Sequence, residues 1–315
     1  MNIDELVTHY IAFRRTLGEK CNTNASILQA FCQAVGTTTA IAAIGAEVVV
    51  AFLNGKGSIT SAWFKKYQAL NGFFRFAISR GHLSEAPLPK VFPKQPPPFV
   101  PYIYTRNEIR RLLDAIPSAH DYRNLIQPGT LRAIVLLLYG AGLRVSEALN
   151  LSIADADLPN ALITVRDTKF FKSRLVPIGQ PLVGVLTEYA QRRAASHPGK
   201  DKESSFFLDR NGIAILLQTM DKTFQRLRDF AGIRRSDGAR FQPRLHDLRH
   251  SFAVHRLIQW YRQGADVQRL LYHLSVYLGH SHLRHTQVYL TMTPELLQHT
   301  GNLFELYARK EDHHA

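Results

Sequence analysis

The chain has 315 residues, of which 39 are Lys or Arg and 25 are Asp or Glu, so its formal net charge is +14 at pH 7. Hydrophobic residues make up 45% of it and charged residues 20%, a composition that is typical of folded proteins and excludes a disordered one. Its two cysteines are too few for a disulfide framework or a four-thiolate zinc site. The positive charge favours a polyanionic partner, and its spread along the chain favours nucleic acid over a membrane surface.

The beginning of the chain, MNIDELV, carries acidic residues where a secretion signal needs a basic region followed by an apolar run. The most apolar stretch, residues 40–53, contains Gly45 and Glu47 and is too short to span a bilayer. The sequence therefore predicts a cytoplasmic protein without a membrane segment.

Helical patterns dominate residues 1–86, because apolar residues recur there at the spacing of one helix face. The second of these helices is expected to follow a cap at Asn22 or Thr23, whose side chains can accept hydrogen bonds from the first turn. The helical and short apolar segments are expected at 6–17, 27–35, 48–53 and 60–79.

The last of these segments, 60–79, and the residue that follows it carry basic side chains at Lys65, Lys66, Arg75 and Arg80. Charges placed in this way fit either a solvated helix face or contacts with a polyanion. The four residues are therefore candidate contacts to DNA.

Prolines mark the boundary between two parts of the chain. Seven of the fifteen fall between Pro87 and Pro101. Such a run cannot continue a helix or pair inside a sheet, and it favours an extended backbone. The sequence therefore predicts a helical domain at 1–86, a proline-rich linker at 87–101 and a second domain at 102–315.

The second domain is expected to be helix-rich with a small sheet. A capping box at Thr105 and Glu108 begins one helix, and a buried helix over 131–139 ends at the sequence Gly140-Ala141-Gly142. Residues 161–165 and 175–178 have the pattern of a β-hairpin. The predicted fold class is mainly α with a small antiparallel β-sheet, an α+β fold.

Four clusters of polar residues in the second domain could carry chemistry, and the first follows the two glycines. Arg144 lies at the opening of a new helix, and Glu147 comes three residues later. A guanidinium held by rigid backbone can bind a phosphate or a carboxylate through two hydrogen bonds. A simple surface pair between Arg144 and Glu147 is the alternative.

The second and third clusters lie at the hairpin tip and on a later helix. Residues 168–174 form the tip and place basic side chains where they reach a ligand or remain solvated. His246 and Arg249 are three residues apart, so they share a helix face. A zinc site is not favoured, because HDLRH lacks the glutamate of HExxH and the His-rich stretch contains no cysteine.

The fourth cluster runs from Tyr277 to Tyr289 and contains His280 after a Leu-Gly pair. Taken alone, Tyr289 fits a core aromatic with a hydrogen-bonded hydroxyl, and His280 fits a loop histidine with a satisfied ring. The order of all four clusters carries more information than any one of them.

In order and spacing, the clusters resemble the tyrosine recombinase, or phage integrase, family. The motifs AGLRVSEAL, TKFFKSRLVP, HDLRHSFA and LGHSHLRHTQVY carry the resemblance, which covers about residues 102–300. The helical first domain resembles the family's core-binding domain in length, helicity and position. Residue by residue, the resemblance implies Glu147 as the acidic neighbour of the first arginine and a catalytic set of Arg144, Lys169, His246, Arg249, His280 and Tyr289.

The resemblance implies a reaction on double-stranded DNA that uses neither a metal ion nor another cofactor such as ATP. Tyr289 would attack phosphorus, become a 3′-phosphotyrosine and release a 5′-hydroxyl. Arg144 and Arg249 would hold the non-bridging oxygens, and His246 would handle the proton of the nucleophile. The remaining roles, acid for the leaving oxygen and hydrogen-bond donor to the phosphate, fall to Lys169 and His280.

One departure from the family concerns the hairpin turn, which usually contains glycine but here contains Phe170-Phe171. The hairpin lysine is therefore either Lys169 or Lys172. Lys172 and Arg174 are further candidate contacts to DNA, and the extra histidines His282 and His285 have no assigned role.

The implied function is site-specific recombination in the integration, excision or transposition of a mobile element. It implies a homo-tetramer on DNA and accessory DNA-bending proteins, and the tail after Tyr289 would pack on a neighbouring protomer or on its own domain. Two alternatives are a type IB topoisomerase-like activity and a non-catalytic DNA-binding or architectural protein on the same fold. A metal-dependent nuclease is a weaker third alternative.

Overall fold

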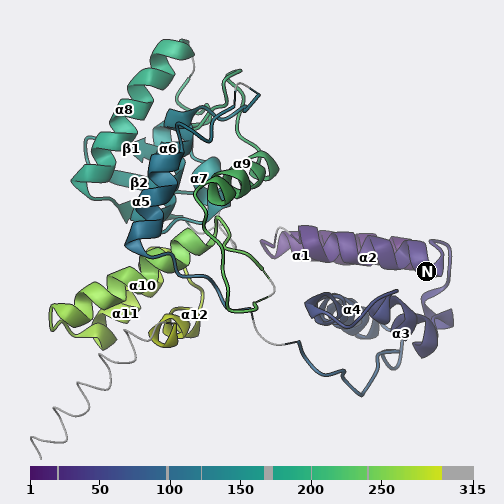
Figure 1. Cartoon of the computed structure of the whole chain (residues 1–315). Coiled ribbons are helices and arrows are strands. Elements are labelled where there is room, and N and C mark those ends of the chain that lie inside the picture. Colours follow the sequence, from purple (N-terminus) through teal and green to yellow (C-terminus); the bar gives the residue numbers. More distant parts are fainter. Residues whose placement is uncertain are drawn as a thin grey trace, which may run out of the picture. The chain divides into compact units, whose positions relative to one another are not determined.

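The computed structural model describes residues 1–19, 21–96, 99–121, 123–166, 173–199, 201–239 and 241–292. The chain divides into two compact units (Figure 1). The first unit is Met1–Phe99, and the second consists of the described residues from Val100 onward. Among the described helices, none combines the length and the apolar character needed to cross a membrane.

The first unit is helical, as its apolar spacing predicts. Its core contains the fully buried rings of Phe31, Phe73 and Phe74. The predicted cap of the second helix, Asn22 or Thr23, was one or two residues too late: Cys21 is the capping residue, and it has a φ of 51° and no capping hydrogen bond from its side chain. The elements are α1 (Ile3–Thr16), α2 (Asn22–Val35), the short 3₁₀ helix η1 (Ile41–Ala43), α3 (Ala46–Asn54) and α4 (Ser61–Ser79).

The beginning of the proline-rich segment packs on the first unit. The ring centroid of Phe92 lies 4.8 Å from that of Tyr67 and 6.0 Å from that of Trp63. Leu83 and Leu88 are partly buried against the same core. Aromatic contacts of this kind hold an extended chain on a surface without secondary structure.

The second unit combines helices with one three-stranded antiparallel sheet in the order β1-β2-β3, which confirms the predicted fold class. The two predicted hairpin strands pair with Ile163 opposite Val176. The helices are α5 (Arg106–Ala115), α6 (Pro128–Ala141), α7 (Val145–Leu149), α8 (Gln180–Ser196), α9 (Leu217–Phe230), α10 (Asp247–Arg262), α11 (Val267–Leu278) and α12 (Arg284–Gln287). The 3₁₀ helices and strands are η2 (Ile153–Asp155), η3 (Val288–Thr291), β1 (Ala156–Asp157), β2 (Leu162–Val165) and β3 (Arg174–Pro177).

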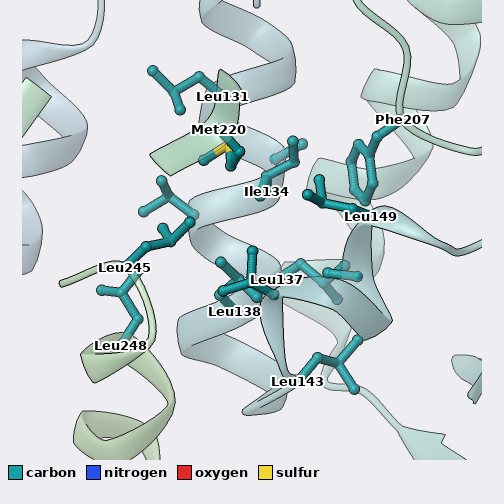
Figure 2. Close-up of a cluster of buried hydrophobic side chains, with 14 of the residues drawn as sticks. Leu131, Ile134, Leu137, Leu138, Leu143, Leu149, Phe207, Met220, Leu245 and Leu248 are labelled. Atoms are coloured by element: carbon teal, nitrogen blue, oxygen red, sulfur yellow. The ribbon is translucent and has the colours of Figure 1, made fainter. Parts of the chain in front are cut away.

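Helix α6 forms the centre of the second unit. Its leucine and isoleucine side chains meet residues from later segments, including Phe207, Met220 and Leu248 (Figure 2). The helix ends at Gly142, whose φ is +61°. A Cβ at Gly142 would lie only 2.4 Å from the ring of Phe252, so glycine alone fits this turn.

A second, smaller core positions the end of the described chain. Helices α10 and α11 contribute Phe252, Leu257, Leu271 and Leu278, and Tyr289 of η3 packs among them. The tyrosine is therefore fixed against α10 by apolar burial.

Candidate active site

Three arginines from distant segments meet at the C-terminal end of α11. Carbonyl oxygens of the consecutive residues 277–279 accept hydrogen bonds from Arg174 (Nε, 2.9 Å), Arg249 (Nη2, 2.7 Å) and Arg144 (Nη2, 2.9 Å). Carbonyls at a helix C-terminus carry partial negative charge, which stabilises nearby cations. The end of α11 therefore acts as an anchor for the three guanidinium groups.

Two left-handed glycines shape this anchor. Gly279 ends α11 with a φ of +67°, and a Cβ there would lie 2.9 Å from Nη1 of Arg174. Gly142 ends α6 and presents its carbonyl to Nη1 of Arg249 at 2.7 Å. Both turns use a backbone conformation that favours glycine and let an arginine approach closely.

Glu147 is the counter-ion of the arginines. Its two carboxylate oxygens accept hydrogen bonds from both Nη atoms of Arg174, at 3.0 and 2.8 Å, and Oε1 also accepts one from Arg144 at 2.6 Å. Burial raises the pKa of Glu147, but the hydrogen bonds and charge of Arg174, followed by those of Arg144, outweigh it and hold the pKa at about 2. The carboxylate is therefore ionised at neutral pH.

Arg249 is the most deeply buried member of the cluster, with 2% of its side chain exposed. Burial, and next the charge of Arg144, lower its pKa to about 10, so it stays protonated at neutral pH. Its Nη1 lies 3.9 Å from Oε2 of Glu147. Three guanidinium groups and one carboxylate leave a net charge of +2 (3 − 1), which suits an anion such as a phosphate.

Tyr289 has 3% of its surface exposed, and its hydroxyl lies 3.2 Å from Nδ1 of His250. Its ring centroid is 6.2 Å from that of His280. Burial raises the pKa of Tyr289, while the charge of Arg249, a hydrogen bond from that arginine and the charge of Arg144 act in the opposite direction. The hydroxyl therefore lies within the field of both arginines.

Two neutral histidines, His250 and His280, lie beside the tyrosine, and a third, His246, packs on His250. Burial, and then neighbouring charges, lower the pKa of His246 and His250 to about 4 and that of His280 to about 3. The rings of His246 and His250 lie 5.1 Å apart, edge to face. His280 shares a 2.7 Å hydrogen bond through Nδ1 with Thr286, a fully buried residue.

The structure brings together five residues of the predicted catalytic set, and also Glu147. Lys169 and Lys172 lie outside the described residues. His282 and His285 are exposed beside the site. The residues placed together, through hydrogen bonds or ring contacts around α7, α10 and the end of α11, are Arg144, His246, Arg249, His280 and Tyr289.

Two residues have contacts that sequence reasoning missed. Arg174, taken as a candidate DNA contact, is only 12% exposed, and its guanidinium is bonded to Glu147 and to the end of α11. This arrangement favours a structural role over a direct contact with DNA. His250 reaches Tyr289, and its one available signal was its place directly after Arg249.

The basic residues of α4 and its cap are mostly exposed, as in the cases of Lys65, Arg75 and Arg80. Lys66 is different, because its Nζ donates a 2.6 Å hydrogen bond to the carbonyl of Phe52 and lies 4.4 Å from that ring centroid. Lys66 therefore closes the end of α3. Among all the residues that the structure describes, no three His, Cys, Asp or Glu residues gather as a metal site would require.

Known proteins with similar sequences indicate the family of the chain. A sequence profile described as the phage integrase family matches residues 103–295. The chain is 34% identical over 301 residues to y4rB of Sinorhizobium fredii, whose name describes a presumed integrase or recombinase, and the match covers 93% of this chain and 94% of that protein. It is 37% identical over 235 residues to tyrosine recombinase XerA of Thermococcus kodakarensis, covering 73% of this chain and 71% of the relative.

Among solved structures, the Tn1549 transposon integrase in complex with transposon right end DNA shares the fold, with a TM-score of 0.69 and 18% sequence identity. The match covers 98% of this chain and 100% of that one. The profile match, which spans more than half of the chain, and the two relatives lead to one assignment. The chain belongs to the phage integrase family and is a tyrosine recombinase.

Proposed function

We propose that Tyr289 is the nucleophile with which this recombinase cuts and rejoins double-stranded DNA at specific sites of a mobile element. Its attack on phosphorus would form a 3′-phosphotyrosine and release a 5′-hydroxyl. One observation carries the proposal: Arg144 and Arg249 are both fixed on the end of α11, and their charges act on the hydroxyl of Tyr289. A phosphodiester bound by these arginines would lie next to the nucleophile.

The arginines supply the charge that the reaction needs. Arg144 and Arg249 bind the two non-bridging oxygens and stabilise the charge that develops on the phosphorane-like transition state. Their anchoring to carbonyls holds them in position before DNA arrives, so little free energy is lost in ordering them at the moment of reaction. Glu147 keeps the cluster together by offsetting part of its repulsion.

The histidines and the hairpin lysine provide the remaining functions, which are hydrogen bonds to the phosphate and proton transfer. His280 uses Nδ1 for Thr286, so we assign Nε2 to the phosphate oxygen. His246 belongs to the same group around the nucleophile, through its ring contact with His250. The protonation of the 5′-oxygen is assigned to Lys169, with Lys172 as the alternative on the same hairpin.

The phosphotyrosine ester retains the free energy of the broken bond, so a 5′-hydroxyl of another strand can reverse the step without ATP. Exchange between two duplexes needs four cuts, and each chain supplies one Tyr289. We therefore propose a homo-tetramer on DNA, with accessory DNA-bending proteins. The tail after Tyr289 would pack on a neighbouring protomer or on its own domain.

The first domain, proposed at 1–86, would hold the DNA together with the second domain, at 102–315, through a linker at 87–101. The exposed Lys65 and Arg75 are candidate contacts to the phosphate backbone. Transposon-end DNA bound by the Tn1549 integrase, which shares the fold, supports DNA as the partner. The reaction would take place in the cytoplasm, where the two cysteines stay unpaired, as the structure has them.

Trapping the covalent intermediate tests the proposal. The substrate is a nicked duplex whose site is recovered by rounds of binding from a pool with a randomised central segment. EDTA-treated wild type should form an adduct that survives a denaturing gel, and Tyr289→Phe should form none. Tyr272→Phe, which changes an exposed tyrosine on α11, is the matched control and should keep the adduct. An adduct with Tyr289→Phe, or one that requires added metal, contradicts the proposal.

The same material separates recombination from its alternatives. Family membership favours recombination over topoisomerase-like relaxation and over a purely architectural role. Two duplexes that carry the recovered site should exchange strands when mixed with wild type. Relaxation of supercoiled DNA without any exchange would favour the topoisomerase-like activity instead.

A further inference from the structure

We propose that His250 is a catalytic residue that accepts the proton of the Tyr289 hydroxyl during attack on DNA. The inference rests on the proposed function, because it concerns the same cleavage step. His250 is not in the catalytic set that the sequence motifs imply, where this task falls to His246. The contact that points to His250 is the 3.2 Å distance between its Nδ1 and the hydroxyl oxygen of Tyr289.

The local fold explains this contact. His250 directly follows Arg249 on α10, so the two side chains leave the helix on adjacent faces of the same turn. Tyr289 packs on α10 from η3, and its ring lies 5.6 Å from that of His250 at a tilt of 58°. Tyr289 is 3% exposed, so protein groups rather than bulk water surround its hydroxyl. The base nearest to this hydroxyl in the described structure is therefore a protein group, Nδ1 of His250.

The charge state of His250 suits an acceptor. Burial, and then the charges of Arg244 and Arg249, lower its pKa to about 4, so the ring is neutral at pH 7. A neutral imidazole with its proton on Nε2 presents a lone pair at Nδ1, which can accept the phenolic hydrogen. The titratable or charged groups that face this ring are Arg244, His246, Arg249, His280 and Tyr289.

Bound DNA would strengthen the base at the moment it is needed. A phosphate held by Arg144 and Arg249 offsets one of the two cations that lower the proton affinity of His250. The affinity of the ring for a proton then rises when the substrate is in place. In the free enzyme the same cations keep the ring neutral and ready to accept.

The proposed step is balanced. The bond between phosphorus and the oxygen of Tyr289 forms as the O–H bond breaks, and the proton moves to Nδ1 of His250. The bond from phosphorus to the 5′-oxygen breaks, and that oxygen takes a proton from the hairpin lysine. During rejoining, a 5′-hydroxyl attacks the phosphotyrosine and gives its proton back to the hairpin lysine. The bond between phosphorus and the tyrosine oxygen breaks, and protonated His250 returns its proton to that oxygen.

The test measures the rate of adduct formation in a single turnover on the recovered nicked duplex. His250→Ala should slow it about 100-fold or more at neutral pH, in the range of lost general-base catalysis. The deficit should shrink toward alkaline pH, because hydroxide then replaces the missing base. The matched control is His255→Ala, which removes another histidine of α10 that hydrogen-bonds a tyrosine, Tyr139, through Nδ1 at 2.8 Å. It should keep the wild-type rate.

Two further comparisons isolate proton transfer. His250→Asn can still hydrogen-bond Tyr289 but cannot take its proton, so it should remain as slow as His250→Ala. A substrate with sulfur in place of the 5′-bridging oxygen has a leaving group that needs no acid. It should not rescue His250→Ala, because the defect lies on the attacking side. A wild-type rate in His250→Asn, or rescue by sulfur, overturns the proposal.

The adduct formed by wild type distinguishes a failure of the proposed function from a failure of the role of His250. If wild type forms no adduct, the proposed function falls and the role of His250 falls with it. If wild type forms the adduct and His250→Ala matches its rate, only the role of His250 is overturned. DNA binding and thermal melting of each variant are measured beside the rates, and His250→Asn decides the question if His250→Ala fails to fold.

Discussion

The two units of this recombinase place their charges in opposite ways. Among the described residues of Met1–Phe99, the buried side chains are apolar, as in the case of Phe31 and Phe74, and cations such as Lys65 lie at the surface. The second unit buries Arg249 and Asp247 almost completely. Burying an ion is costly unless partners satisfy it, so such groups contribute less to stability than an apolar core does.

The apolar cores give the two units their stability, whereas the buried ionic cluster of the second unit supplies the groups for chemistry. An apolar core of aromatic rings gives the first unit its fold without any reactive group. The second unit has its own apolar core around α6, and it keeps a buried ionic cluster at the end of α11 in addition. The same kind of substitution should therefore change the stability of the two units by different amounts.

The largest effect is expected at Glu147. Glu147→Gln leaves the guanidinium groups of Arg144, Arg174 and Arg249 without their counter-ion, so the free energy of unfolding of the second unit should fall by about 3–5 kcal/mol. Urea denaturation followed by the fluorescence of Trp260 in a Trp63→Phe background measures it.

A control in the first unit tests the contrast. Glu85→Gln removes one partner of an exposed ion pair with Lys90, whose atoms are 3.2 Å apart. Its effect on the first unit, read from Trp63 in a Trp260→Phe background, should stay below about 0.5 kcal/mol. Equal losses in the two variants would remove the contrast between the units.

The next effect is a loss of stability in acid. The folded pKa of His250 is about 4, below its usual value of 6.5, so the stabilisation linked to its neutral form is present above pH 6.5 and is lost as the pH falls toward 4. We expect His250 alone to account for roughly 3 kcal/mol of the loss over this window, measured through Trp260, because His246 and His280 also have lowered pKa values and add losses of their own. His250→Asn should make the dependence shallower by this share and leave the parts due to His246 and His280, and an unchanged slope in that variant would exclude His250 as a source.

A smaller effect separates two left-handed glycines that end helices. Gly142→Ala adds a Cβ that would lie 2.4 Å from the ring of Phe252, whereas Gly81→Ala in the first unit meets no atom within 4 Å. Both substitutions strain a positive φ by about 1–2 kcal/mol, and overlap should bring the cost of Gly142→Ala to about 2–4 kcal/mol. Paired urea titrations of the two units compare them, and a larger loss at Gly81 would contradict the packing argument.

The smallest effects are expected on α4. Lys65→Ala should leave stability unchanged, weaken binding of the recovered duplex and reduce the slope of log affinity against log salt by about 1. Lys66→Ala should in addition lower the stability of the first unit by about 1 kcal/mol, because it removes the hydrogen bond to Phe52. An unchanged salt dependence in Lys65→Ala would remove this residue from the DNA contacts.

The sequence predicts the elements well where the signal is local. The capping box of α5 and the paired strands β2 and β3 follow from residue type and spacing, and the structure confirms them. The glycine end of α6 is confirmed at Gly142, but the helix begins at Pro128 and continues through Gly140 and Ala141, beyond the expected 131–139. The strand β1 was missed because two residues, Ala156 and Asp157, carry no periodicity. The start of α2 was misplaced because Cys21 gives no capping signal.

The candidate site was predictable in its residue types but not in its contacts. The motifs point to Arg144, Arg249 and Tyr289 as separate positions. They do not say that Arg174 would turn inward to Glu147, or that His250 would reach Tyr289, because these contacts depend on how β3 and η3 pack on helices far away in the sequence. Local sequence patterns do not predict such contacts between distant segments.

The anchoring of three arginines at the end of α11 also links the enzyme's activity to its own synthesis. Arg144 and Arg174 are separated from their carbonyl partners by 135 and 103 residues, and Arg249 by 29. Contacts of such separation close late, after most of the unit has been made and folded. A chain still on the ribosome, or one that stops before residue 279, holds its arginines but lacks the carbonyls that align them. Such a chain also lacks Tyr289, so the alignment of the arginines and the proposed nucleophile are both completed only when the chain has been made beyond residue 289.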